Sequence, residues 1–148
     1  MSLVKSTILK NWRLTSVDYI DRKLSGLARV LSLKGQNDNI AATTLFDSKA
    51  SMLVRVTVYR VLTTVDAVSS TLPQVTIGWT DADNSTALTV TVVTTNAGNT
   101  KATFGTSSQG SIVINKKGGV DVTYATTGYL SNTANAMQYS LYITVEEL

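Results

Sequence analysis

The chain has 148 residues, of which 43% are apolar and only 16% charged, so its composition excludes a disordered chain and fits one domain with its own core. It contains no Cys and no His, which excludes disulfides, thiolate metal sites, and the Ser-His-Asp and Cys-His forms of catalysis. We therefore expect no enzymatic activity and no cofactor. No apolar run reaches the roughly 18 residues that a membrane-spanning helix needs, and the first residues read as mature sequence, not as a signal peptide.

Residues 1–26 are predicted to form an arm ahead of a domain at 27–148. Residues 1–60 hold ten Lys/Arg against four Asp, a net charge of +6, whereas residues 61–148 hold three Lys against six Asp/Glu, a net charge of −3. A basic segment of this kind either binds an acidic partner or stays solvated. It is either extended or a short helix capped by Ser16. We expect it to dock on another chain through Lys5, Lys10, Trp12, Arg13, Tyr19, Arg22 and Lys23.

Two strands are predicted next, at about 27–34 and 40–46, with a polar turn at 35–39 between them. From about residue 50 onward, apolar residues alternate with period two, which is typical of half-buried strands. The pattern recurs in SMLVRVTVYRVLT, PQVTIGWT, ALTVTVV, SIVIN, VDVTY and AMQYSLYITVEEL. The last is the clearest, because Met137, Tyr139, Leu141, Ile143 and Val145 share one face.

Segments rich in Gly, Asn, Asp and Ser separate these strands: DADNS, NAGN, TSSQG, KKGG and SNTAN. The KKGG segment, residues 116–119, is predicted to be a tight hairpin. The only proline, Pro73, opens a strand, where its missing N–H does least harm. Turns at intervals of roughly 8–12 residues predict an all-β sandwich or barrel.

Three stretches resemble a widespread phage virion domain family: NIAATTLFDSKASMLVRVTVYRVLTT, STLPQVTIGWTDADNSTALT and GVDVTYATTGYLSNTANAMQYSLYITVEEL. That family has an IAATTLY strand, a YRVSVY-type strand, a VTIGWTD-type strand and a final AMQY-type strand. The resemblance covers about residues 39–148 and leaves residues 1–35 uncovered. It identifies a building block that serves both in capsid cement (decoration) proteins and in tail or receptor-binding fibres.

The resemblance implies a fold and an assembly. It implies an antiparallel jelly-roll β-sandwich of about eight strands, and commonly a trimer about a threefold axis. The extended N-terminal arm that completes the predicted fold rests on the sequence of residues 1–26, which the resemblance does not cover. Oligomerisation is one way to protect the edge strands of such a sandwich.

Asp81 and Asp83 suggest a cation loop at first. Counted from Asp81, however, an EF-hand would need Gly at the position of Thr86 and Glu at that of Val92. A glycosidase needs two carboxyl groups facing each other across a cleft, and nothing else in the chain predicts one. We therefore interpret DADNS as a turn, since Asp and Asn cap turns and accept left-handed backbone.

Tyr59, Tyr129 and Tyr142 are the candidate interface residues of the domain. They suit either a platform for stacking on sugars or a subunit interface. The sequence pI of about 9.2 makes nucleic-acid binding a hypothesis to consider. The basic residues are dispersed, however, and no motif of a known nucleic-acid-binding domain is present. Direct nucleic-acid binding is therefore not expected.

The leading hypothesis is a capsid cement protein on the exterior of the virion. It would bind the major capsid protein as a homotrimer and stabilise the assembled head shell. The alternative is a tail-fibre or receptor-binding module that binds carbohydrate. The absence of a long fibrous shaft favours the cement protein.

Overall fold

The structure, a computed structural model, describes residues 29–132 and 136–148. Within these residues the chain forms the strands β1 (Arg29–Gln36), β2 (Thr43–Phe46), β3 (Met52–Thr64), β4 (Ser70–Leu72), β5 (Gln74–Thr80), β6 (Ala87–Val93), β7 (Asn96–Asn99), β8 (Ser107–Lys116), β9 (Val122–Thr127) and β10 (Gln138–Glu147), and one short 3-10 helix, η1 (Lys101–Thr103). The predicted arm at 1–26 lies outside the described residues, so the arm and its boundary with the domain stay predictions.

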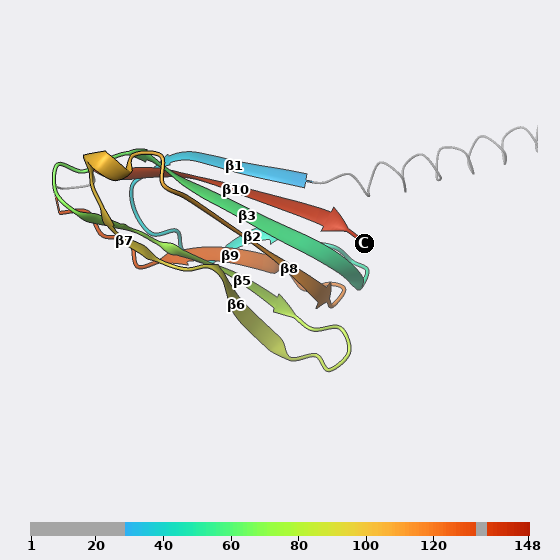
Figure 1. Cartoon of the computed structure of the whole chain (residues 1–148). Coiled ribbons are helices and arrows are strands. Elements are labelled where there is room, and N and C mark those ends of the chain that lie inside the picture. The colour runs from blue at the N-terminus through green and yellow to red at the C-terminus, as the bar shows by residue number, and fades with distance from the viewer. Residues whose placement is uncertain (1–28, 133–135) are drawn as a thin grey trace, which may run out of the picture.

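Eight of the strands form two four-stranded antiparallel sheets, in the orders β1-β10-β3-β8 and β2-β9-β5-β6, while β4 pairs with β7 (Figure 1). Numbered along the chain, the eight strands pair first with last, second with seventh, third with sixth and fourth with fifth. This is a long hairpin wound into a sandwich, which is the pairing of a jelly roll. The predicted fold class is therefore confirmed.

The core lies between the two sheets, where period-two alternation points one face of each strand inward. The predicted inward set of the last strand is buried throughout, from Met137 to Val145. In β3 the residues Val54, Val56 and Val58 are buried in the same way, and Val75 and Ile77 of β5 face them from the other sheet. Each such side chain contributes roughly 1.5–3 kcal/mol through burial, so these positions dominate the stability of the fold.

The two sheets meet closely along β6 and β8. A Cβ atom at Gly110 of β8 would overlap the carbonyl oxygen of Val92 in β6, so a side chain cannot be placed there without moving backbone. The glycine thus allows the edges of the two sheets to come together on this side of the sandwich.

Two predicted turns are strands, and a third turn does not close the predicted hairpin. KKGG is a turn, but it does not close a hairpin: β8 before it pairs with β3, and β9 after it pairs with β2 and β5, so the segment crosses from one sheet to the other. NAGN forms β7, and most of TSSQG belongs to the start of β8. Gly, Asn and Ser mark these segments as turns locally, whereas the pairing partners that make them strands lie far away in sequence.

Candidate interaction surface

The outer face of the β1-β10-β3-β8 sheet places two tyrosines side by side. Tyr59 in β3 and Tyr142 in β10 are direct cross-strand partners and both point away from the core. Their ring centroids are 6.1 Å apart, with an angle of 38° between the ring planes. This is within the range of favourable aromatic pairs, which contribute about 0.5–1.5 kcal/mol beyond their buried area.

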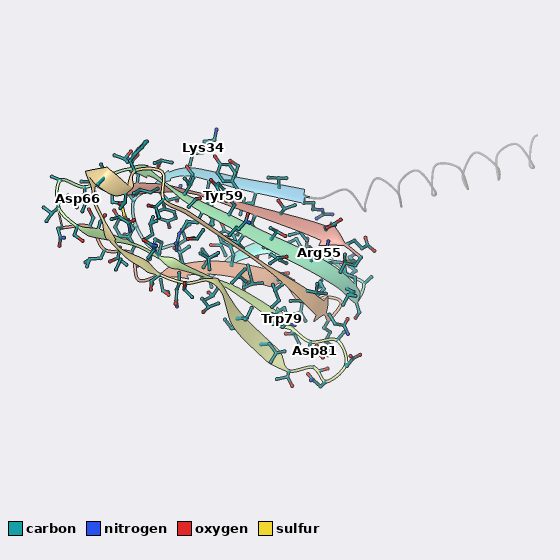
Figure 2. The ribbon with its side chains drawn as sticks, viewed as in Figure 1. Lys34, Arg55, Tyr59, Asp66, Trp79 and Asp81 are labelled. Atoms are coloured by element: carbon teal, nitrogen blue, oxygen red, sulfur yellow. The ribbon has the colours of Figure 1, made fainter. Side chains whose placement is uncertain are left out.

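In the register of the four strands, aliphatic and hydroxyl side chains surround this pair. Figure 2 labels Tyr59 and Arg55 on this sheet. Four of its hydrophobic residues are strongly exposed: Val30 (65%), Leu53 (47%), Tyr59 (39%) and Val113 (49%). We call the surface the tyrosine face, made of Val30, Ser32, Leu53, Arg55, Thr57, Tyr59, Gln109, Ser111, Val113, Tyr142, Thr144 and Glu146.

Polar contacts on the tyrosine face run between its own strands. Arg55 donates to Glu146 at 3.1 Å, which is the one ion pair found among residues 29–132 and 136–148. The hydroxyls of Thr57 and Ser111 lie 3.1 Å apart and share a hydrogen bond. Because these groups satisfy each other, the face presents little net charge and keeps its apolar groups uncovered.

The outer face of the other sheet differs in chemistry. None of its four strands, β2, β9, β5 and β6, contains a charged residue. The register sets threonines next to each other there, for example Thr76 opposite Thr91 and Thr44 opposite Thr123. We call this surface the threonine face, made of Thr44, Gln74, Thr76, Gly78, Thr89, Thr91, Thr123, Ala125 and Thr127.

Tyr129, the third predicted interface tyrosine, is not brought together with the other two. It is half-buried, its hydroxyl donates to the carbonyl of Met137 at 2.7 Å, and its ring lies 6.2 Å from that of Tyr139. Burial raises the pKa of Tyr129 above its ordinary value. Its contacts therefore place it in the packing against the core.

A buried arginine was missed in the sequence, although the alternation of β3 puts residue 60 on the inward face. Arg60 is fully buried. Its guanidinium donates to the carbonyls of Pro73 and Thr94 and to the Ser108 hydroxyl, and ties β3 to two connections and to β8. Burial lowers its pKa to about 10, against the opposing effect of Tyr139, so the group stays charged at neutral pH.

A buried lysine, Lys116, was also missed. Its ammonium donates to the carbonyl of Ser48 at 2.9 Å and lies 5.4 Å from the centre of the Phe46 ring. Burial lowers its pKa, while Asp47 and Asp121 raise it. Both buried cations bind backbone carbonyls, which supports structural roles, and charge alone gave no signal that they face inward.

Asp81 and Asp83 lie in the turn between β5 and β6, as the sequence predicts (Figure 2). One carboxylate oxygen of Asp81 accepts hydrogen bonds from the backbone N–H of Asp83 and Asn84, at 3.0 and 3.2 Å. Ser85 adopts a left-handed φ of 59°, and Asn115 donates to Asp83 at 3.2 Å. The acids of DADNS thus shape the turn and fix it to the neighbouring strand.

The predicted arm contacts lie outside the residues that the structure describes, and the remaining predictions concern metal sites and membrane-spanning helices. The expected arm contacts, Lys5, Lys10, Trp12, Arg13, Tyr19, Arg22 and Lys23, all belong to residues 1–28. In the described part of the chain, no group of three or more acidic side chains is placed to hold a metal ion. No helix there has the length and apolar character to cross a bilayer.

No protein-family model matches the chain, and no curated protein matches it either. Among solved structures, the VP2 subviral particle of infectious bursal disease virus is 16% identical with a TM-score of 0.42; the match covers 80% of this chain and 33% of that one. The CBM22-1 xylan-binding domain of Paenibacillus barcinonensis Xyn10C is 14% identical with a TM-score of 0.40, covering 82% of both chains.

A third solved structure is that of the Bacillus endospore appendages, described as disulfide-linked pili. It is 14% identical with a TM-score of 0.34, and the match covers 82% of this chain and 86% of that one. The chain spans about a third of the length of the virus protein. Similarities of this size carry no information on function, which must come from the chain's own residues.

Proposed function

We propose that this protein is a structural protein of a bacteriophage virion, a capsid cement protein that binds the major capsid protein on the outside of the head shell. The observation that carries the proposal is the tyrosine face, which exposes aromatic and aliphatic groups on a sheet with one ion pair. Such a surface is suited to burial against another protein. The sequence resemblance of residues 39–148 to phage virion domains supports the same role.

The energetic reason lies in the kind of side chain that the face presents. Tyrosines at the centre of an interface contribute much of the binding free energy when water is excluded around them. The hydroxyl and aliphatic groups beside Tyr59 and Tyr142 can surround the pair and exclude that water. The internally paired Arg55 and Glu146 leave little uncompensated charge to desolvate.

Stabilisation of the shell follows from linkage. A protein that binds only the assembled lattice stabilises that lattice by RT ln(1 + c/Kd) per site, where c is the concentration of free protein. In the proposed trimer, three arms and three faces bind together, so the effective concentration of the second and third contacts raises the overall affinity.

A carbohydrate-binding fibre module is the second candidate, because the exposed Tyr59–Tyr142 pair is also the kind of group that stacks on sugar rings. The 38° angle between the two rings makes the pair a poor flat platform for this purpose. No carboxylate or asparagine of the tyrosine face lies beside the pair in the register, where Gln109 and Ser32 are the flanking partners.

The test uses purified full-length protein and heads of the phage that encodes it, stripped of the protein beforehand. Wild-type protein should sediment with the heads and raise their melting temperature. A Tyr59→Glu substitution should weaken binding more than tenfold, because it places a charge at the centre of the buried patch. The matched control is Thr91→Glu, which adds the same charge to the threonine face and should bind like wild type.

Two results would contradict the proposal. Wild-type protein that fails to bind stripped heads but is retained on host polysaccharide is a fibre-type module instead. Equal loss of binding in Tyr59→Glu and Thr91→Glu would show that the tyrosine face has no special role. The size of the free protein in solution tests the trimer separately, because a strict monomer contradicts the trimer and leaves head binding open to measurement.

A further inference from the structure

A pocket of about 380 Å³ opens at the end of the sandwich where β1 begins and β10 ends. Figure 1 shows the start of β1 beside the labelled C-terminus. The inner part of the pocket is apolar and is lined by Phe46, Met52, Val54 and Val145. It is large enough for one aromatic side chain or two aliphatic ones, and it lies on the side of the sandwich opposite the β6–β8 contact.

The rim of this pocket carries charges of both signs without ion-pair partners. Arg29, Asp47 and Glu147 line it and are exposed. Among the described residues the single ion pair is Arg55–Glu146, so none of the three rim charges has an ion-pair partner within 4 Å. Asp47 also acts at longer range on the Lys116 ammonium, whose pKa it raises. A pocket lined equally by apolar and polar groups suits a peptide that combines apolar and charged side chains.

We propose that residues 1–28 of the same chain dock in this end pocket. The segment joins the domain at Arg29, which is itself part of the rim. It contains five Lys/Arg against two Asp, a net charge of +3, which complements the two acids against one base at the rim. It also supplies Trp12, Tyr19 and Ile20 as apolar groups of the required size.

The tether makes this contact favourable. A chain extends by at most about 3.3–3.6 Å per residue. Residues up to about 24 are therefore separated from Arg29 by enough chain to reach the pocket beside it. Short flexible tethers give effective concentrations in the millimolar range, so weak contacts suffice for docking. The contact goes beyond the proposed function, because it belongs to the free chain and is measured without any head shell. Binding of the arm to the head shell then requires that the segment leaves the pocket.

The experiment places one spin label in the segment and reads a methyl group in the pocket. The chain has no Cys, so Ser16→Cys takes a nitroxide label at one site. It has three Met residues, Met1, Met52 and Met137, so ¹³C-methyl labelling gives three signals from the full chain. Docking should broaden the methyl signal of Met52, which lines the pocket, far more than that of Met137. Met137 is distant from the pocket, since it lies roughly 27 Å along the chain from Val145, another lining residue. Met1 reports that the label is active.

A charge-reversal pair tests the rim. Glu147→Lys in the labelled protein should restore most of the Met52 intensity, because it turns an attractive rim charge into a repulsive one. The matched control is Asp83→Lys, which makes the same change of net charge in the β5–β6 turn and should leave Met52 broadened.

Two outcomes would overturn the inference. The first is a Met52 signal of equal intensity with the label active and reduced. The second comes from mixing ¹³C-labelled protein without nitroxide and nitroxide-labelled protein without ¹³C. Broadening of Met52 in that mixture would mean that a second copy of the chain occupies the pocket.

Discussion

The two outer faces of the sandwich arise from the same alternation and differ in what they present. The tyrosine face carries Tyr59 and Tyr142, exposed aliphatic groups and an internal ion pair. The threonine face has neither a charge nor an aromatic ring among its residues. A low-charge, Thr-rich sequence therefore does not give a uniform surface. One sheet exposes aromatic and aliphatic groups, and the other presents mainly threonine hydroxyls.

The largest expected effect on the free energy of unfolding is that of a substitution at Gly110, where the two sheets meet, compared with one at Gly78 on the threonine face. Gly110→Ala should lower the free energy of unfolding by roughly 3 kcal/mol, because the new methyl group meets the backbone carbonyl of Val92. Gly78→Ala is the comparison. Its Cβ would lie 2.8 Å from the Thr123 hydroxyl, which can rotate away, so the expected loss is below about 1 kcal/mol. Urea denaturation measures both, and equal losses would contradict the role given to Gly110.

The next largest effect on the free energy of unfolding concerns Tyr139, which faces inward from β10, whereas Tyr142 faces outward from the same strand. Tyr139 is fully buried, and its hydroxyl donates to the carbonyl of Asp38 at 2.9 Å. Tyr139→Phe should cost about 1–2 kcal/mol at neutral pH, since the partner carbonyl is left without its donor.

Tyr139 also predicts a pH dependence. Burial raises its pKa in the folded protein above 10.0. Because the unfolded chain loses this proton first, the contribution of Tyr139 is fully present below pH 10 and is lost as pH rises through the folded-state pKa. The stability difference between wild type and Tyr139→Phe should therefore shrink above pH 10. A constant difference from pH 8 to pH 11 would contradict this.

A smaller effect is the coupling between Tyr59 and Tyr142. A double-mutant cycle with both residues changed to Ala should give a coupling of about 1 kcal/mol in the free energy of unfolding. The corresponding cross-strand pair on the threonine face, Thr76 and Thr91, should couple by less than about 0.5 kcal/mol. Couplings of the same size on both faces would remove the energetic distinction between them.

The smallest effect is that of the exposed ion pair. Both side chains are about half exposed, at 46% for Arg55 and 45% for Glu146, so the pair should contribute no more than about 0.5 kcal/mol. The coupling measured between Arg55→Ala and Glu146→Ala should fall further in 1 M salt. A large, salt-independent coupling would mean that the tyrosine face holds a stronger polar network than its geometry indicates.

Much of the fold could be predicted from the sequence because period-two alternation is local. The inward set of β10, from Met137 to Val145, and that of β3, from Val54 to Val58, were both predicted and both confirmed. The turn at Asp81 was predicted from side chains that bind their own backbone. In contrast, NAGN was taken for a turn because its partner strand, β4, lies more than twenty residues earlier in the chain.

The candidate surface was predicted only in part. Alternation placed Tyr59 and Tyr142 on outward positions, but nothing local showed that β10 returns to lie beside β3 and makes them neighbours. Arg60 and Lys116 were missed for a related reason. A long cationic side chain is normally expected in water, and only the carbonyl groups that the tertiary structure brings to them explain their burial.

Residue types and their spacing along single strands were enough to predict an all-β domain with alternating faces, the turn at Asp81, and the absence of His and Cys chemistry. These properties depend on residue type and on neighbours along one strand. The pairing of the strands, the two faces that result, the place of the end pocket and the burial of two cations became visible in the folded chain. The physical reason is that all of these depend on contacts between segments far apart in the chain, and local patterns carry no information about such partners.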